Sequence, residues 1–346
     1  MAGLFDLEFH EKKIKEYQPT LAKLDLVIDW EMFRETIEKA LYVEPKGAGG
    51  RPPFDKIMMF KILILQKYYN LSDEQTEFQI NDRTSFKQFL GLKIGDTIPD
   101  EKTIWHFKEQ LANKDLSKSL FEMFAVALMD KGIIAKEGSI VDATFVDVPK
   151  QRNSKEDNAD IKKGAVPLKF GKKDKNGKQS KLCQKDTDAR WMTKSGEKHF
   201  GFKDHINADE KTKLITKYSV TSAAPHDSTE IENIVDETDN RLHADSAYRS
   251  KEIEEHLKAI ECESFVHEKG YRGSPLTEQQ KESNNKKSKI RARVEHISGF
   301  MTNSMNNALY MRSIGIKRIK ESIGLLNLTY NLFRFEQLIR LEKVKI

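Results

Sequence analysis

Hydrophobic residues recur at helical spacing from Trp30 to about Leu128, which predicts a mostly helical first part of the chain. Trp30, Phe33, Ile37 and Leu41 share one helical face, preceded by an aspartate that suits a helix N-cap. This repeating pattern predicts an all-α region whose apolar stripes pack together. Several short helices with tight connections are typical of a helix-turn-helix unit, and equally of a plain bundle that supports the next domain.

Turn and cap residues divide this helical region. The stretch PKGAGGRPPFD, residues 45–55, is rich in Gly and Pro and predicts a linker. Ser72 is followed three positions later by Gln75, the pattern of a capping box, and Asp100 precedes another apolar-periodic run. We therefore expect new helices to begin at these caps.

After Gly132 the apolar period changes from helical to alternating. Strands are predicted in the stretches SIVDATFVDV, HFGFKDHINAD, LITKYSVTSA, RLHAD and ESFVHE. Helices are predicted at residues 226–240 and 251–260, and one long helix from Thr277 past Arg312. This order predicts a mixed five-stranded sheet: an antiparallel meander, then parallel strands joined by helices on its faces.

The last part of the chain predicts a helix of its own. Ile316, Ile319, Ile323, Leu326 and Tyr330 follow one another at helical steps. Such spacing is typical of an amphipathic helix that packs one face on a core.

Charge is unevenly distributed along the 346 residues, whose net charge is +5. Between Lys150 and Lys198 there are 15 Lys or Arg against 7 Asp or Glu, a local net charge of +8. This excess favours a polyanion-binding segment, although a solvated lysine-rich loop has the same composition. A second basic stretch, Lys281 to Arg293, holds six Lys or Arg and one acid.

Several classes of protein are disfavoured by what the sequence contains. The first residues have no signal-peptide core, and the run IMMFKILIL is interrupted by Lys61 and too short to span a bilayer. Cys183 and Cys262 form no CxxC pair, so a disulfide framework is not expected. The chain lacks GxxxxGK[ST] and a strand-linked GxGxxG, so no nucleotide cofactor is predicted. We expect a cytoplasmic protein with no membrane partner.

Asp142 poses the central question, because it lies in the middle of the apolar strand SIVDATFVD. A buried carboxylate is unfavourable by several kcal/mol, on the order of the desolvation penalty, unless an arginine, backbone amides or a metal ion compensates. Asp245 ends the strand RLHAD, where sheets with parallel strands place their ligands. Glu295 borders the apolar stripe of the long predicted helix.

If the two aspartate strands are neighbours, the three carboxylates converge. Carboxylate oxygens without matching arginines favour Mg²⁺ or Mn²⁺ over zinc. Two such ions roughly 3.5–4 Å apart activate a water or 3′-hydroxyl and stabilise the leaving oxygen of a phosphodiester. The alternatives to a metal site are that Asp245 only caps a turn, that Glu295 only pairs with Arg291, and that Asp142 has a structural role.

These segments resemble the D-D-E transposases of bacterial insertion sequences, which have a ribonuclease H-like catalytic core. VDATFVDVPK resembles the first-aspartate strand of that family, and TSAAPHDS and ADSAYRS resemble the segments around its second aspartate. DARWMTKSGEKHFGFKDHINAD resembles the block that leads into the next strands. GRPPFDKIMMFKILILQKYYNLSDEQTEFQINDRTSFKQFLGL resembles the N-terminal helical region, so the similarity covers about residues 30–310.

The resemblance implies that Asp142, Asp245 and Glu295 are the catalytic, metal-binding triad and that two Mg²⁺ or Mn²⁺ ions are the cofactors. Around the glutamate the family has a tyrosine, an arginine four positions before it and a lysine seven after it. Arg291 matches, whereas Ser288 and Thr302 stand at the other two positions.

Beyond the triad, the candidates for DNA phosphate contacts are basic residues near the glutamate, and a histidine and an aspartate are candidates for supporting the site. The phosphate candidates are Lys287, Lys289, Arg291 and Arg293, and the supporting pair is His226 and Asp227.

As a whole, the resemblance implies a transposase that binds terminal inverted repeats, cleaves the transposon ends and joins them to target DNA as a dimer or larger assembly. We expect residues 1–132 to form the all-α DNA-binding domain, 133–312 the catalytic core with a basic insertion at 150–198, and 313–346 a packing helix. The protein would be found in the bacterial cytoplasm, on the nucleoid when bound to DNA.

Two alternatives are a ribonuclease H-like structure-specific nuclease and a DNA-binding protein whose chemistry has decayed. A His/Asp metallohydrolase is disfavoured because HExxH is absent.

Overall fold

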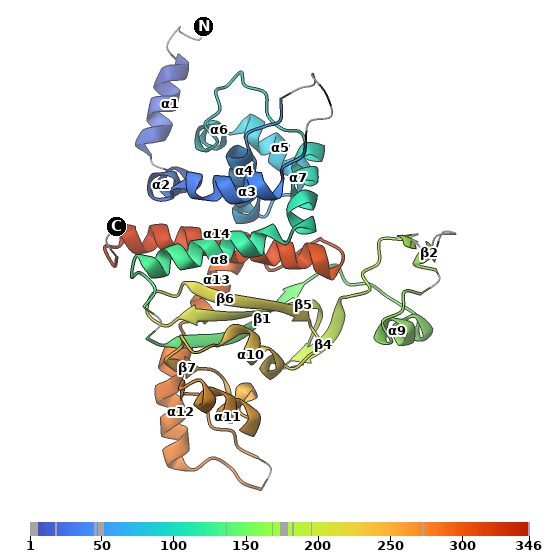
Figure 1. The fold of residues 1–346 in the computed structure, drawn as a ribbon, viewed down its shortest axis with the longest axis vertical. Helices are drawn as coiled ribbons and strands as arrows, with labels where there is room; N and C mark the ends of the chain where they lie inside the picture. Colours follow the sequence, from blue (N-terminus) through green and yellow to red (C-terminus); the bar gives the residue numbers. More distant parts are fainter. Residues whose placement is uncertain are drawn as a thin grey trace.

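A computed structural model of the chain describes residues 6–344 apart from 18, 45–46, 48–51, 136, 168, 174–178, 182, 195 and 272. The described residues form helices, then a mixed sheet with helices, then a long final helix (Figure 1). None of the helices in these described ranges combines the length and apolar character needed to cross a membrane. Most of the predicted linker at 45–55 lies outside the described residues.

The first part of the chain is helical, as its apolar period predicts. Its helices are α1 (Asp6–Glu16), α2 (Thr20–Val27), α3 (Arg34–Ala40), α4 (Lys56–Tyr69), α5 (Asp73–Asp82), α6 (Thr84–Phe89), α7 (Glu101–Asn113) and α8 (Leu116–Asp130). The capping box of Ser72 and Gln75 is present, and Asp29 and Asp100 accept hydrogen bonds from backbone amides as N-caps. These three predicted caps are therefore confirmed.

The sheet is mixed and, within the described chain, has six strands rather than the predicted five. It is formed by β1 (Ser139–Asp147), β4 (Arg190–Lys194), β5 (Glu197–Asp209), β6 (Ile215–Ser222), β7 (Arg241–His243) and β8 (Glu263–Ser264). Strand β5 pairs antiparallel with β1, β4 and β6, whereas β7 is parallel to both β1 and β8. The antiparallel meander and the two parallel strands are thus confirmed.

The extra strand comes from the basic segment, which has no sustained period in sequence. β4 pairs with the start of β5 through a tight turn, and its positions are mostly exposed. The same segment contains α9 (Lys155–Lys162) and the short hairpin β2 (Gly171–Lys173) and β3 (Gln179–Lys181). These elements form an arm that extends sideways from the sheet (Figure 1). An edge strand with little burial leaves no alternating apolar signal, which explains the missed strand.

Two predicted helices are shorter than their patterns indicate. Residues 226–240 form only a 3₁₀ turn, η2 (Asp227–Glu230), and α10 (Ile231–Ile234). The unbroken helix predicted from Thr277 past Arg312 is wrong: α12 (Glu278–Arg291) ends in a turn, and α13 (Glu295–Gly299) continues into a π-helical turn at Phe300–Ser304. Left-handed backbone at Asn306 and Asn307 then ends the helical run.

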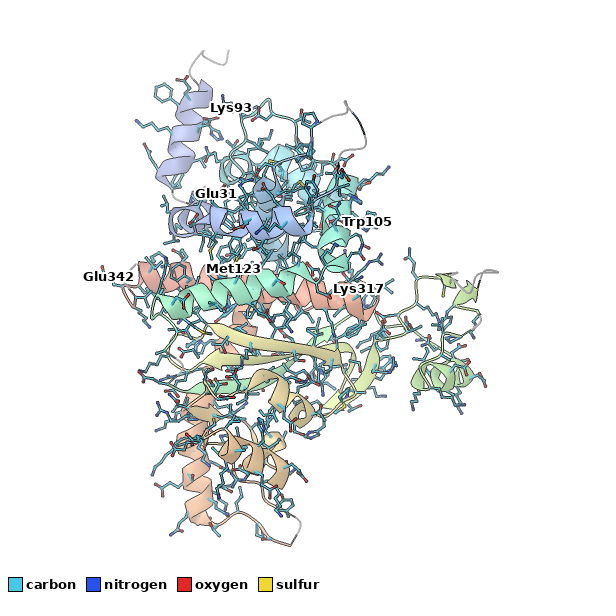
Figure 2. The ribbon with its side chains drawn as sticks, in the orientation of Figure 1. Glu31, Lys93, Trp105, Met123, Lys317 and Glu342 are labelled. Carbon is cyan, nitrogen blue, oxygen red and sulfur yellow. The ribbon has the colours of Figure 1, made fainter. Side chains whose placement is uncertain are left out.

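The final helix α14 (Ile316–Arg340) lies between the N-terminal helices and the sheet (Figure 1). It packs against α2, α4, α7 and α8 on one side and β6 on the other. Residues on nearly all of its sides are buried, including Asn327, Thr329 and Asn331, so the predicted one-sided amphipathic helix is wrong. A single hydrophobic cluster joins the N-terminal helices, one face of the sheet and α14. Figure 2 shows Met123 on α8 and Lys317 at the start of α14 along this middle layer.

The opposite face of the sheet has a second, smaller core. Val141 and Leu242 from the strands pack there with residues of α10 and α11 (Lys251–Ala259). Ile140 and Val146 belong to the first cluster, so side chains of β1 alternate between the two cores. This double burial explains the apolar residues on both sides of β1, and it makes a carboxylate in the middle of the strand, Asp142, unusual.

Candidate active site

Asp142 lies on β1, and Asp245 follows two residues after the end of its parallel neighbour β7. The pairing of β1 with β7 matches Ser139 with Leu242 and Ile140 with His243. Continuing this register by two residues sets Asp142 beside Asp245, just after β7 ends. The predicted convergence of the two aspartates at this edge of the sheet therefore agrees with the strand order.

Asp245 also acts as a helix cap. Its side chain accepts a hydrogen bond of 2.8 Å from the Ala247 amide at the start of the 3₁₀ turn η3 (Ser246–Tyr248). One carboxylate oxygen is used in this bond. Capping and a role in the site are compatible, because a carboxylate has two oxygens and about four acceptor positions.

The environment of Asp142 disfavours its ionised form. Burial raises the pKa of Asp142 from 3.8 to about 6, and the charge of Asp245 adds to the increase. The charges of Arg291 and Lys194 and the Ala143 amide lower the pKa without restoring its ordinary value. The carboxylate is thus only partly compensated by its cationic neighbours.

Arg291 links the first and third predicted triad members. Its guanidinium lies 3.9 Å from an Asp142 oxygen and 3.7 Å from a Glu295 oxygen. Both distances are too long for direct hydrogen bonds but within the range of an ion pair. Glu295, at the first residue of α13, is 67% exposed. It therefore adjoins the aspartate pair through Arg291, and the predicted pairing of Glu295 with Arg291 is present.

In this arrangement the three carboxylates do not form a closed cage. Among the residues that the structure describes, no group of three or more His, Cys, Asp or Glu side chains is arranged to hold a metal ion. The donor chemistry of Asp142 and Asp245 nevertheless suits a hard divalent cation, since both offer carboxylate oxygens at one point. The exposed Glu295 side chain would have to turn past Arg291 to join them.

The other predicted basic residues have different surroundings. Lys287 donates to the Val266 carbonyl at 2.8 Å, and Arg293 donates to the Glu210 carbonyl at 2.8 Å. Lys289 is exposed on the surface of α12. Lys287 thus fastens α12 to the segment that follows β8, Arg293 fastens the turn after α12 to the segment that follows β5, and the exposed Lys289 is open to a ligand.

The two residues predicted to support the site are not equivalent. Asp227 forms an ion pair of 2.7 Å with the buried Lys203, whose ammonium also donates to the Pro225 carbonyl. His226 is exposed and caps the η2 turn by accepting from the Ser228 amide. Asp227 is therefore the one that faces the interior.

Tyr248 is a neighbour that the sequence pattern does not single out. Its side chain is 1% exposed, and its hydroxyl has no hydrogen-bond partner among the described residues. Burial raises its pKa, and the charges of Asp227, Asp142 and Asp245 raise it further. The hydroxyl is therefore near three carboxylates. Its sequence signal is weak, because a tyrosine three positions after Asp245 is indistinguishable from an ordinary core aromatic residue.

Comparison with protein families accounts for most of the chain. Residues 8–110 match a family described as Transposase domain (DUF772), and residues 134–332 match the Transposase DDE domain. No solved structure matches the chain significantly. The second match alone spans more than half of the sequence and includes both strands that bear the aspartates. The chain therefore belongs to the DDE transposases of insertion sequences.

Proposed function

We propose that this transposase cuts DNA at the ends of its element and joins the 3′-hydroxyl ends to target DNA, using Asp142, Asp245 and Glu295. The observation that carries this proposal is the placement of two carboxylates, one on β1 and one just after the end of its parallel neighbour β7. The partly compensated charge of Asp142 agrees with a site that takes up a cation.

We further propose that the core is of the ribonuclease H-like type. Its support is the strand order β6-β5-β1-β7-β8, a meander followed by two parallel strands, with helices on both faces. Under this proposal residues 133–312 are the catalytic core, 313–346 the packing helix, and 1–132 the region that binds terminal inverted repeats. Pairing two ends calls for a dimer or larger assembly.

Mg²⁺ or Mn²⁺, held by the three carboxylates, would supply activation of the attacking oxygen and stabilisation of the leaving one. The residues around it have separate tasks. Arg291 is placed to neutralise phosphate charge beside Asp142, and the exposed Lys289 extends this positive surface along α12. Asp227 and Lys203 support the loop beside the site through their ion pair.

One observation favours an alternative, a DNA-binding protein without cleavage activity. Arg291 lies between Asp142 and Glu295, and Ser288 and Thr302 occupy the positions of the family tyrosine and lysine. Thr302 is exposed and its hydroxyl donates to the Ser298 carbonyl, so it offers no cation for a phosphate. A nuclease that cuts without joining is the second alternative.

The decisive experiment is cleavage of linear DNA that carries the element's ends, with Mg²⁺ or Mn²⁺. Wild type is compared with Asp142→Asn, Asp245→Asn and Glu295→Gln. The matched control is Glu282→Gln on α12, because Glu282 is exposed and pairs with Lys286 of the same helix.

We expect metal-dependent nicking at the ends that the three triad variants lose while they still bind DNA, and joined products that separate transposase from nuclease. Variants that cut as well as wild type would show that these carboxylates are not the catalytic ones. Binding without cleavage by every form, wild type included, would favour the decayed protein.

A further inference from the structure

A cavity of about 650 Å³ has Glu295 in its lining. It lies between α13 with its π-helical turn, the loop that joins β5 to β6, and the last turns of α14. Its lining includes several hydrogen-bond donors, among them Lys213, His296, Asn303 and Arg334. Glu295 is the acidic residue in that lining.

The cations of this cavity are surrounded by further cations. Burial lowers the pKa of Lys213, and the positive charges of Arg334, Arg293 and Lys343 lower it further. In the described chain no ion pair links Lys213 or Arg334 to a carboxylate; Arg334 instead donates to the Thr212 carbonyl and to Gln337. Like charges held together without counter-ions attract an anion.

Lys213 is held in an unusual backbone conformation. Its φ is +63°, in the left-handed region where glycine or asparagine is less strained. The loop around it is fixed by α14: the Tyr330 hydroxyl donates to the Lys213 carbonyl at 2.8 Å, and Asn331 bonds both backbone groups of Ile215. The loop that carries Lys213 into the lining of the cavity is therefore anchored to α14.

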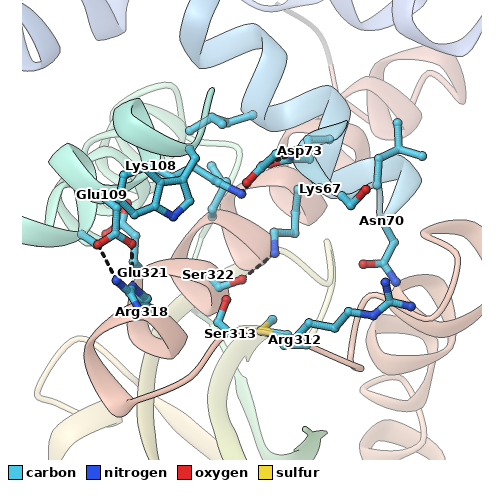
Figure 3. Close-up of a pocket in the computed structure, with 18 of the residues that line it drawn as sticks. Lys67, Asn70, Asp73, Lys108, Glu109, Arg312, Ser313, Arg318, Glu321 and Ser322 are labelled. Atoms are coloured by element: carbon cyan, nitrogen blue, oxygen red, sulfur yellow. Dashed lines mark hydrogen bonds and ion pairs between the residues drawn. The ribbon is translucent and has the colours of Figure 1, made fainter. Parts of the chain in front are cut away.

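Another cavity in the described chain differs in its charges. It measures about 350 Å³ and lies between α4, α7 and α14 (Figure 3). There Arg318 pairs with Glu109 at 2.6 Å, Lys108 pairs with Asp73, and Lys67 donates to the Ser322 hydroxyl. Among the described residues, Lys108 and Arg318 are thus paired with carboxylates and Lys67 and Arg312 are not, whereas neither Lys213 nor Arg334 beside Glu295 has such a partner.

We propose that the cavity formed by Lys213, Arg334, His296 and Asn303 binds the phosphodiester backbone of the DNA strand that enters the active site past Glu295. This assignment rests on the proposed function, because it needs DNA to be cut at the neighbouring carboxylates. Lys213 and the free terminal nitrogen of Arg334 would contact phosphate oxygens, and they would hold the strand without reading its sequence.

The test is the salt dependence of DNA binding, measured by fluorescence anisotropy with an end-labelled linear duplex in EDTA. The variants are Lys213→Asn, since asparagine tolerates the left-handed backbone, and Arg334→Gln. The control is Lys320→Gln, which removes one exposed charge from the same helix outside the cavity. Circular dichroism confirms that each variant folds. If Arg334→Gln does not fold, the result for Lys213→Asn decides the test, because that variant keeps the hydrogen bond from Arg334 to the Thr212 carbonyl.

We expect each cavity variant to reduce the slope of log affinity against log salt by about 0.9, the value for one lost phosphate contact, while the control keeps the wild-type slope. Triad-dependent cleavage by wild type together with unchanged slopes in both cavity variants would overturn this inference and leave the proposed function standing. Failure of wild type to cut would instead count against the proposed function. A wild-type melting temperature raised by inorganic phosphate over chloride at equal ionic strength, with unchanged DNA slopes, would assign the cavity to a free anion.

Discussion

Replacement of Asp142 by asparagine should stabilise the fold while it abolishes cleavage. Asparagine has nearly the same shape as a protonated aspartate, so the exchange removes only the charge. The pKa of Asp142 rises from 3.8 to about 6 because burial disfavours the ionised carboxylate, with the attraction of Arg291 already included. The substitution therefore tests directly whether this charge is unfavourable in the metal-free protein.

The size of the expected stabilisation follows from the raised pKa of Asp142. One pKa unit corresponds to about 1.4 kcal/mol, so an ionised Asp142 lowers the free energy of unfolding by about 3 kcal/mol at pH 8. Because 23% of the side chain is exposed, solvent screening reduces this to roughly 1–3 kcal/mol. The folded-state pKa lies above the unfolded one, so wild-type stability falls as pH rises from about 4 to 6 and is level above that range.

The assay is chemical denaturation in EDTA at pH 5 and pH 8, followed by tryptophan fluorescence. Asp142→Asn should be more stable than wild type at pH 8, and the difference should shrink by about half at pH 5. If Asp142 is a metal ligand as proposed, Mg²⁺ should then stabilise wild type more than the variant, because the substitution removes a charged carboxylate ligand. Asp147→Asn, the same exchange at a 39% exposed site on the same strand, is the control. An Asp142→Asn protein less stable than wild type at pH 8 would refute this reasoning.

Four further substitutions probe the surrounding fold. Asp204→Asn should stabilise the protein at pH 8 by up to about 4 kcal/mol, because burial raises the pKa of Asp204 to about 7; cleavage by this variant should match wild type in the same gel assay. Gly201→Ala should lower the free energy of unfolding by about 3 kcal/mol or more, because its new methyl group would overlap the Val146 carbonyl oxygen in the sheet. In the same denaturation series Gly324→Ala should have a smaller effect, because its methyl group would meet mainly a tyrosine side chain that can move. Lys287→Gln should lower the melting temperature by a few degrees, on the order of 1 kcal/mol, while the salt slope of DNA binding stays at the wild-type value, because its ammonium is bound to a backbone carbonyl.

The sequence predicted those parts of the fold that depend on residues close together in the chain. Ser72 with Gln75 is a capping box in the structure because its two hydrogen bonds need only the residues between them. The strand that bears Asp142 is predicted by its apolar, β-forming residues, which follow from burial on both faces of the sheet. The order of antiparallel and parallel strands is predicted by the connections, which short turns or helices determine.

Features that depend on distant partners could not be predicted in the same way. Asn327 and Asn331 look like the polar side of a surface helix, yet they bond Asp204 and the backbone of β6 inside the core. The break after Arg291 has no glycine or proline to mark it in sequence. Because that break determines where Glu295 begins its helix, the relation of the glutamate to Asp142 is a tertiary property.

Three kinds of partner could compensate the buried charge of Asp142: an arginine, backbone amides or a metal ion. The first two are present, as Arg291 at 3.9 Å and the Ala143 amide, and the pKa of Asp142 still remains near 6. A raised pKa alone does not identify a metal site, because the pKa of Asp204 is also raised and its carboxylate faces a buried asparagine. What distinguishes Asp142 is a second carboxylate, Asp245, two residues after the end of the neighbouring strand β7. Two adjacent acids repel each other, and a divalent cation relieves that repulsion more fully than a guanidinium at 3.9 Å can.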